Sequence, residues 1–403
     1  MKLLHQQMVL KVDVIGDMDN NSIRVLFVAH STGFGGASRS MLQLMIELRN
    51  NYNVTPIVLM PYSFNQNDKY SIKYMCNKNS IEVIETFVPW FKRSSFVKFC
   101  ILYLLHSLYL PVTMWKLRHY NFDLIHSNGS VQSLGGLLSR LFKIPHVWHL
   151  REFGFLDFGF KDYIGKWHER MIYKRGDVFI AISKIIKNAY TDVIPAEKIK
   201  VIYNGISVTD YNKQAHHTNT KIQFVCVGAV HESKNQLDVI KATKLLVDSG
   251  VTDFMINIVG PESKDYKEQL DTYIKENEIS DFITFHGIRN DVPNFLEGMD
   301  IGLMLSNNEA FGRVTVEYML QNLAVIASNT GANPEIISNN EIGLLYKHGE
   351  PEDLAQCMKQ LIEDNNLLKS MSTAGQLYAR EMFPSSKNTR LIYDIYKSVL
   401  APL

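Results

Sequence analysis

The sequence predicts an α/β protein made of two Rossmann-like domains. At 403 residues the chain is too long for one hydrophobic core of ordinary size, so two domains are expected. Short apolar runs rich in β-branched residues alternate with helix-length segments, a pattern typical of parallel sheets. The polar segment 209–220 lacks periodicity, and the same alternation restarts after it. The expected parts are an extension at 1–22, an N-terminal domain at 23–208, the linker at 209–220, a C-terminal domain at 221–382 and a final helical segment at 383–403.

The individual elements follow from local patterns along the chain. Apolar runs predict strands at 23–30, 54–60, 81–87, 122–129, 145–150, 177–183, 199–206, 224–228, 254–260, 300–305 and 343–346. Apolar residues at helical spacing predict helices that begin near Arg39 and that cover 132–142, 265–277, 295–299, 314–321, 351–364 and 387–400. In the last helix, Ile392, Ile395, Tyr396 and Val399 form one apolar face.

A glycine-rich turn follows the first strand and contains Gly35 and Gly36. Such a turn, placed between a strand and a helix, lets the backbone approach a phosphate or a sugar closely. The spacing is not G-x-G-x-x-G, so the dinucleotide fingerprint is absent. A flexible turn without a ligand remains the alternative interpretation.

The segment 309–317 has the strongest functional pattern. It follows the apolar run 300–305 and a short polar loop, and Gly312 lies where the loop becomes a helix. The first amides of that helix, at about 313–316, are expected to lack intrahelical partners and to favour an anion. Glu309 in the loop and Glu317 one turn into the helix then border the same ligand. A diphosphate with hydroxyl-rich groups on both sides, as in a nucleotide sugar, suits this arrangement. A surface helix with incidental acids is the alternative.

These residues also carry a resemblance to a known family. Residues 309–317 read E-A-F-G-R-V-T-V-E, and residues 328–337 read S-N-T-G-A-N-P-E-I-I. This string resembles the signature of the retaining glycosyltransferases of family 4, which have the GT-B fold. The resemblance covers about residues 23–400 and is strongest in the C-terminal half. It implies two domains facing across a cleft, with the segment 383–403 crossing back onto the N-terminal domain.

The resemblance implies a role for each matching residue. The loop 227–234 resembles V-G-R-x-x-x-x-K, whose Lys234 would hold the donor diphosphate. Glu309 would contact the transferred sugar, Glu317 the ribose, and His149 the sugar from the opposite wall. Further donor contacts are implied for Gly35, Gly36, Ile288, Phe311, Gly312, Arg313, Val314 and Thr315.

One position departs from the family pattern. Ala229 stands where an arginine is common, so one of the two phosphate-binding cations is missing. Arg313 or Arg289 would have to substitute for it, or turnover would be low. Arg151 and Glu152 would shape the acceptor pocket, although a structural ion pair gives the same sequence.

The implied activity is a retaining, metal-independent hexosyl transfer, with no cofactor. The donor would be a nucleoside diphosphate sugar, UDP in preference to GDP, and the acceptor a hydroxyl of a glycan or lipid-linked glycan in bacterial polysaccharide synthesis. A non-catalytic partner subunit is the alternative from another class, with Ala229 as the first sign of decay. A nucleotide-sugar epimerase or a phosphorylase is also considered, but no pyridoxal-binding lysine motif is evident.

The most hydrophobic stretch is 96–110, with basic residues around it at Lys92, Arg93, Lys116, Arg118 and His119. It is shorter than the roughly 20 apolar residues of a membrane span. Two interpretations remain open: a buried helix on the sheet, or an interfacial helix that docks on anionic lipid through residues 92–119. The resemblance favours the second, because many relatives use lipid-linked acceptors.

Charge and cysteine content narrow the remaining classes of function. A formal net charge of +1 argues against nucleic-acid binding by bulk electrostatics. The four cysteines lack metal-ligand spacing and are expected to be reduced thiols. Residues 1–7 do not have the pattern of a secretory signal. We therefore expect a cytoplasmic protein, peripheral to the inner face of the cell membrane if the interfacial helix forms.

Overall fold

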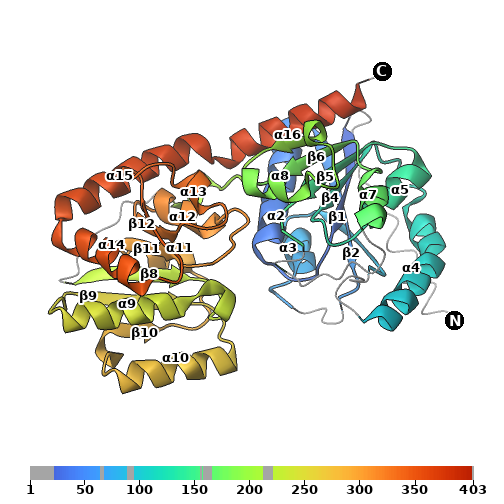
Figure 1. The fold of residues 1–403 in the computed structure, drawn as a ribbon. Coiled ribbons are helices and arrows are strands. Elements are labelled where there is room, and N and C mark those ends of the chain that lie inside the picture. Colours follow the sequence, from blue (N-terminus) through green and yellow to red (C-terminus); the bar gives the residue numbers. More distant parts are fainter. Residues whose placement is uncertain are drawn as a thin grey trace, which may run out of the picture.

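Two parallel sheets, each flanked by helices, organise the computed structural model (Figure 1). The structure describes residues 22–63, 68–88, 95–154, 157, 166–211 and 221–401. Apart from Ser22, the expected extension at 1–22 lies outside these residues. The same is true of 212–220 in the expected linker and of Lys92 and Arg93.

In the described part of the N-terminal half, seven strands form one sheet in the order β3-β2-β1-β4-β5-β6-β7. The strands are β1 Ile23–Ala29, β2 Val54–Pro61, β3 Glu82–Thr86, β4 Leu124–Asn128, β5 His146–Leu150, β6 Val178–Ala181 and β7 Ile199–Val201. The helices are α2 Gly36–Tyr52, α3 Ile72–Lys78, α4 Phe96–Leu117, α5 Leu134–Phe142, α7 Lys166–Tyr173 and α8 Lys184–Tyr190. All neighbouring strands pair in parallel, as their β-branched apolar runs predict.

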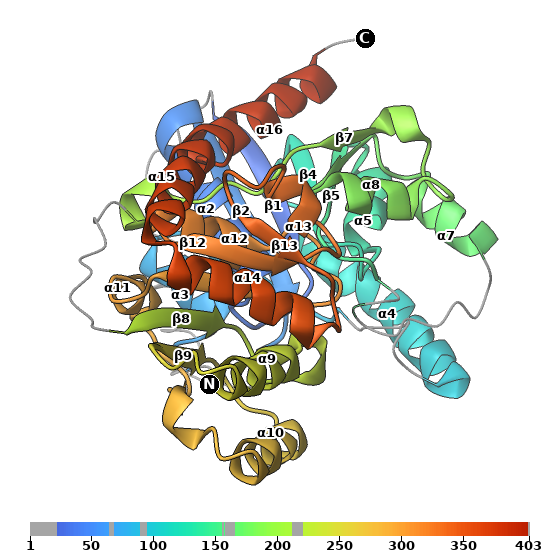
Figure 2. The same cartoon turned by 60° about the vertical axis from the view of Figure 1, so that its left-hand side comes forward.

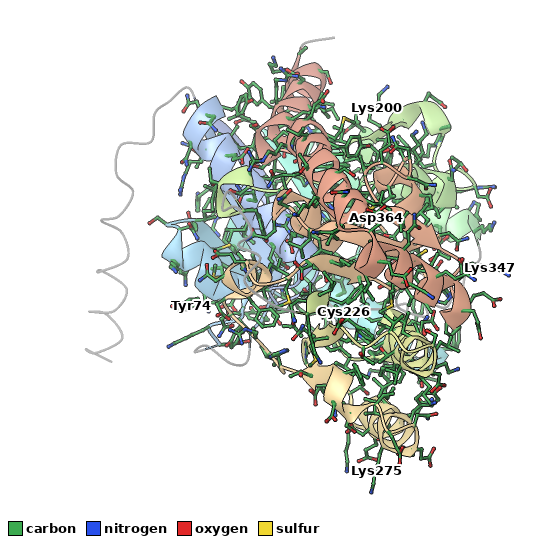
Figure 3. All side chains as sticks on the ribbon, turned by 90° about the vertical axis from the view of Figure 1, so that its left-hand side faces the viewer. Tyr74, Lys200, Cys226, Lys275, Lys347 and Asp364 are labelled. Atoms are coloured by element: carbon green, nitrogen blue, oxygen red, sulfur yellow. The ribbon has the colours of Figure 1, made fainter. Side chains whose placement is uncertain are left out.

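The described C-terminal half repeats this plan with six strands in the order β10-β9-β8-β11-β12-β13. The strands are β8 Ile222–Val227, β9 Phe254–Val259, β10 Ile283–Phe285, β11 Ile301–Met304, β12 Ala324–Ser328 and β13 Leu344–Tyr346. The helices are α9 Gln236–Asp248, α10 Lys264–Glu276, α11 Val292–Leu296, α12 Arg313–Leu320, α13 Asn333–Ile336, α14 Pro351–Glu363, α15 Asn365–Met382 and α16 Ser385–Leu400. Figure 3 shows Cys226 of β8 inside this domain and Lys275 of α10 at its outer tip.

In both sheets the strand order reverses between two central strands. The reversal lies between β1 and β4 in the first sheet and between β8 and β11 in the second. Open parallel sheets bind their ligands at the carboxyl ends of the strands beside such a point. The prediction of two Rossmann-like domains is therefore confirmed, and the topology indicates where each domain presents its loops.

The last helix, α16, crosses from the C-terminal domain to the N-terminal domain (Figure 1). Its Ile392 and Tyr396 are fully buried in the same hydrophobic cluster as residues of β1, β2 and α2. Thr389 also donates a hydrogen bond to Glu47 of α2, at 2.9 Å. The expected return of the C-terminal segment is confirmed, and the core of the N-terminal domain includes residues from the end of the chain.

Several helices differ from the sequence prediction, which did not name α7, α8, α9, α13 or α15. α2 begins at Gly36 rather than near Arg39, because the amide of Arg39 already donates to the carbonyl of Gly35 at 2.9 Å. α11 spans Val292–Leu296 rather than 295–299, with Pro293 in the first turn, where a missing N–H costs little. α15 was not expected, because Ser372, Thr373 and Gly375 lower the helix propensity of its middle.

α4 also differs from its prediction. It continues through Pro111 to Leu117 and has 22 residues, so the expectation that this stretch is too short for a membrane span is wrong. Its most apolar window has a mean hydropathy of 1.5, which by length and composition would allow it to cross a membrane. The buried-helix interpretation is wrong as well, because only 17% of that window is buried and the helix stands out from the domain in Figure 2.

Candidate functional site

The loop between β11 and α12 forms the centre of the candidate site. Gly312 has φ +73°, in the left-handed region that favours glycine, and α12 begins at the next residue. A Cβ at Gly312 would lie 3.0 Å from the hydroxyl of Thr315 and 3.1 Å from Oδ1 of Asn333. Both of these buried oxygens lack a hydrogen-bond partner in the described part of the chain. The start of α12 therefore has unsatisfied polar groups around a glycine, as expected where a polar ligand binds.

Fewer amides are open at this helix end than the sequence predicts. The amides of Thr315 and Val316 donate to the carbonyl of Gly312, at 3.0 and 3.4 Å, so the expectation of four free amides at 313–316 is wrong. Arg313 and Val314 are the first two residues of α12, before the first amides that bond within the helix. Their amides lie at the positive end of the helix dipole. An anion would therefore meet two backbone donors rather than four.

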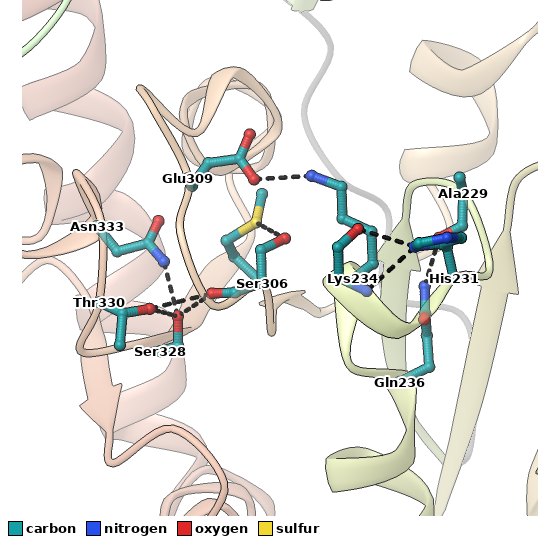
Figure 4. Close-up of polar contacts among 11 residues, drawn as sticks. Ala229, His231, Lys234, Gln236, Ser306, Glu309, Ser328, Thr330 and Asn333 are labelled. Carbon is teal, nitrogen blue, oxygen red and sulfur yellow. Dashed lines mark hydrogen bonds and ion pairs between the residues drawn. The ribbon is translucent and has the colours of Figure 1, made fainter. Parts of the chain in front are cut away.

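A neighbouring loop, after β12, holds the β11–α12 loop in place (Figure 4). The hydroxyls of Ser328 and Thr330 both donate to the carbonyl of Ser306, at 2.6 and 3.1 Å. The amide of Ala332 donates to the carbonyl of Glu309 at 2.8 Å. Gly331 has φ +60°, and a Cβ there would lie 2.4 Å from the amide nitrogen of Glu309. Only glycine fits this contact, so the position of Glu309 depends on Gly331.

Lys234 and Glu309 face one another from the loops that follow the adjacent strands β8 and β11 (Figure 4). Lys234 Nζ lies 2.8 Å from Glu309 Oε2, and the two side chains are 35% and 22% exposed. An ion pair with this much exposure contributes on the order of 1 kcal/mol or less. A diphosphate, which carries more negative charge than one carboxylate, can therefore displace Glu309 from Lys234.

The two arginines considered as substitutes for the cation missing at Ala229 already have acidic partners. Arg313 Nε donates to Glu317 Oε1 at 2.8 Å, and its Nη1 donates to Ser40 of α2 at 3.2 Å. Arg289 pairs with Asp291 at 2.7 Å. Glu317, the expected ribose ligand, is therefore held by Arg313 and is 5% exposed.

His149 lies at the end of β5 in the N-terminal domain and is fully buried. Its Nδ1 accepts a hydrogen bond from Arg151 Nη2 at 3.2 Å, whereas its Nε2 has no partner in the described residues. Burial, reinforced by the nearby Arg151, lowers the pKa of His149 well below its ordinary value. At neutral pH the ring is therefore neutral and carries its proton on Nε2, where it can donate to a ligand.

Arg151 and Glu152, the candidate acceptor residues, do not bond each other in the described structure. Arg151 donates to the side-chain oxygens of Asn128 and Asn204, at 2.5 and 2.6 Å. Glu152 accepts from the hydroxyl of Ser130 at 3.0 Å and also from the backbone amide of that residue. The alternative that Arg151 and Glu152 form a structural ion pair is therefore wrong. Each side chain is instead held by hydrogen bonds to uncharged residues.

The remaining predicted residues lie at different depths. Phe311 is 2% exposed and its ring packs against Tyr203 and Phe383, so its side chain belongs to the core between the domains. Ile288 is 67% exposed in the loop after β10. Gly35 and Gly36 lie at the start of α2, whose Ser40 contacts Arg313 of α12. This glycine-rich turn therefore approaches the candidate site from the other domain.

Further contacts between the domains were not evident from the sequence. Ser183 donates to the carbonyl of Ala310 at 2.6 Å. Glu335 accepts from the amides of Lys184 and Ile185, at 2.7 and 2.8 Å, and so caps the N-terminus of α8. Glu335 belongs to the string S-N-T-G-A-N-P-E-I-I, but it was not among the predicted site residues, and no local pattern indicated its partner. Among the described residues there is no cluster of three or more His, Cys, Asp or Glu side chains that could hold a metal ion.

Comparisons with known proteins agree with this architecture. The family model described as Glycosyltransferase Family 4 matches residues 34–210, and the one described as Glycosyl transferases group 1 matches residues 208–378. An uncharacterized glycosyltransferase of Methanocaldococcus jannaschii is 29% identical over 265 residues, which are 64% of this chain and 71% of that protein. UDP-Gal:alpha-D-GlcNAc-diphosphoundecaprenol alpha-1,3-galactosyltransferase of Escherichia coli is 23% identical over 375 residues, 85% of this chain and 93% of that protein.

Solved structures show the same fold. Anabaena HepE in complex with UDP has a TM-score of 0.78 and 20% sequence identity, and the match covers 93% of this chain and all of that one. The same Anabaena protein has also been solved in complex with UDP-glucose, with a TM-score of 0.75. The overall fold is therefore shared with a protein of low sequence identity.

Proposed function

Because this chain belongs to the family 4 glycosyltransferases of the GT-B fold, we propose that it transfers a hexosyl unit from a nucleoside diphosphate sugar to a hydroxyl acceptor. The observation that carries this proposal is that Lys234, in the loop after β8, lies beside Glu309 and the start of α12, which follow the neighbouring strand β11. A cation and an open helix N-terminus favour a diphosphate. UDP is the proposed nucleotide, in line with the UDP and UDP-glucose complexes of Anabaena HepE.

In this mechanism the diphosphate leaves the anomeric carbon while Lys234 and the amides of Arg313 and Val314 stabilise its developing charge. Glu309, released from Lys234, accepts hydrogen bonds from hydroxyls of the transferred sugar, and Glu317 accepts those of the ribose. The acceptor hydroxyl attacks the face that the diphosphate leaves, and its proton passes to the departing phosphate. The configuration is then retained without an enzyme nucleophile, a metal ion or a cofactor.

The test is the release of nucleoside diphosphate from a panel of UDP-, GDP- and ADP-sugars. We expect slow hydrolysis of one donor, at a rate about 10- to 100-fold lower in Glu309→Gln, because hydrogen bonds to a charged group are lost. Glu276→Gln, an exposed glutamate on α10, is the matched control and should keep the full rate. Full activity in Glu309→Gln would contradict the sugar contact.

Two other outcomes are informative. Binding of a nucleoside diphosphate without release would indicate strict dependence on an acceptor, and lipid-linked glycans would then be added. If the protein neither releases nor binds a nucleoside diphosphate, this result would contradict the enzyme proposal. It would favour the non-catalytic partner subunit. In that case the absence of an arginine at Ala229 would be decisive, since Arg289 and Arg313 are engaged elsewhere.

For the acceptor we propose a lipid-linked glycan reached at the inner face of the cell membrane. The Escherichia coli relative is named for a diphosphoundecaprenol acceptor. α4 has an exposed apolar stripe, formed by Val97, Ile101, Leu104, Leu105, Leu108, Val112 and Trp115. The opposite side is anchored to the domain, since Lys116 donates to the carbonyl of Glu85 at 2.8 Å and Thr113 contacts Thr86 at 2.5 Å. A helix fixed on one side and apolar on the other suits docking on a lipid surface.

Basic residues around the stripe favour anionic lipid. Arg118 stacks on Trp115, 4.3 Å from the ring centroid, and Lys98 lies near the start of the helix. Replacing Leu108 by glutamate is expected to weaken binding to phosphatidylglycerol vesicles about tenfold. The variant loses the free energy of transferring one leucine side chain from water into lipid and gains a negative charge that anionic lipid repels. Sedimentation of the protein with vesicles measures this. The control is Leu377→Glu on α15, which is similarly exposed, at 65%, in the other domain. Equal binding by both variants would exclude α4 from the contact.

A further inference from the structure

A chain of three buried polar side chains connects the last helix to His149. The hydroxyl of Tyr396, on α16, lies 2.7 Å from His126 Nδ1. His126, on β4, in turn places its Nε2 3.2 Å from His149 Nδ1. All three side chains are fully buried. The chain therefore reaches from the C-terminal segment to the residue expected to contact the sugar.

Arg151 fixes the direction of every hydrogen bond in this chain. A guanidinium can only donate, so the contact of Arg151 Nη2 with His149 Nδ1 at 3.2 Å makes that nitrogen an acceptor. Because His149 Nδ1 accepts, the Nε2 of His126 must be the donor to it. His126 Nδ1 is then unprotonated and accepts a hydrogen bond from the Tyr396 hydroxyl. Only this assignment gives each contact one donor and one acceptor.

The hydrogen-bonded series of side chains ends at His149 Nε2, an atom without a partner among the described residues. With its proton excluded from Nδ1, neutral His149 carries it on Nε2, which has no hydrogen-bond partner in the described part of the chain. Burial and the nearby Arg151 lower the pKa of His126 and of His149 well below the ordinary value, so both rings are neutral. Buried donors are nearly always paired, so an unpaired one at a strand end indicates a group that a ligand satisfies.

We propose that Tyr396 is a positioning residue, which holds His126 and through it His149 so that the Nε2–H of His149 donates to the transferred sugar. This inference rests on the proposed function, in which His149 contacts that sugar. Without the Tyr396 hydroxyl, His126 Nδ1 loses its hydrogen-bond donor, and the His126 ring is no longer held from the side of α16. The ring can then turn so that its Nε2–H no longer reaches His149 Nδ1, and His149 keeps only Arg151 as a donor at that nitrogen.

The experiment compares Tyr396→Phe with Tyr393→Phe in the full-length protein. Tyr393 lies on the same helix, and its ring packs on Tyr52 with centroids 4.5 Å apart, outside the histidine chain. Donor turnover is measured, and the hydrogen bonding of the ring nitrogens of His126 and His149 is read from their ¹⁵N shifts in ¹H–¹⁵N long-range NMR correlations. We expect Tyr396→Phe to lower kcat about tenfold, with the donor KM within about twofold, and to shift the ¹⁵N resonance of His149 Nδ1, because the donor contact from His126 is weakened. Tyr393→Phe should change neither readout.

The outcomes separate this inference from the proposed function. An unchanged ¹⁵N shift at His149 Nδ1 in Tyr396→Phe overturns the positioning role, whatever happens to the stability of the variant. Full activity in His149→Ala overturns the sugar contact itself, and the inference with it. Loss of activity in His149→Ala together with full activity in Tyr396→Phe overturns the inference alone. A shifted His149 Nδ1 resonance together with loss of kcat in Tyr396→Phe supports it.

Discussion

Replacing Lys234 by methionine is expected to lower kcat about 10²- to 10³-fold, the usual cost of removing one preorganised group that stabilises a developing negative charge. Methionine keeps most of the length of the side chain and removes only the ammonium group. The expected effect is large because Arg289 and Arg313 are each paired with an acidic residue and Ala229 provides no cation. Steady-state transfer with the donor found in the panel measures the loss.

The control for this substitution is Lys264→Met, because the Lys264 side chain is 85% exposed at the start of α10. It should retain the rate of the unmodified protein. Lys234→Arg is expected to recover part of the activity, since the charge is kept while its geometry changes. A Lys234→Met rate within threefold of the original would show that the α12 amides alone are enough, and the role of Lys234 would have to be abandoned.

Replacing Gly331 by alanine is expected to reduce kcat/KM about 100-fold, the loss that a displacement of about 1 Å at a reacting group can cause. The added Cβ would lie 2.4 Å from the nitrogen and 2.5 Å from the oxygen of Glu309. These are backbone atoms, which cannot rotate away. The loop that carries Glu309 must therefore shift. Steady-state kinetics measures the activity, and thermal unfolding measures the stability.

Gly349→Ala provides the matched control for the backbone conformation. Gly349 also has a positive φ, +81°, but nothing lies within 4 Å of a Cβ placed there. Gly349→Ala should lower the free energy of unfolding by about 1–2 kcal/mol, because alanine is strained in the left-handed region. Gly331→Ala should lower it further, because its Cβ also clashes with the backbone of Glu309. Only Gly331→Ala should also lose activity. Equal kinetic losses in both variants would mean that strain, rather than contact with Glu309, is responsible.

The sequence alone predicts those strands and helix ends that are determined by neighbouring residues in the chain. The β-branched runs at 23–30 and 254–260 are strands in the structure, within one residue at their ends. Gly312 was expected where the loop becomes a helix, and it is the residue before α12. α15 was missed, because the signal for that helix lies in its packing on α12 and β12 rather than in its own propensity.

The candidate site was predicted only where its residues lie in one motif. Glu309, Gly312 and Glu317 are close in sequence, so their proximity in space could be inferred. His126 and Tyr396 are 270 residues apart, and no local pattern predicts their hydrogen bond. The orientation of the His126 ring that this bond supports follows from tertiary structure alone. The exposure of α4 was open for the same reason, since hydropathy does not specify what covers a helix.

The crossing of α16 has a consequence for how the protein is made. Ile392 and Tyr396 complete the core of the N-terminal domain, yet the ribosome adds them after the whole C-terminal domain. At about 5–20 residues per second, residues 221–382 take roughly 10 to 30 s to synthesise. During that time the apolar face of α2 has no covering helix. A chain interrupted before α16 would therefore leave the domain that was translated first unfinished, and exposed to aggregation and proteolysis.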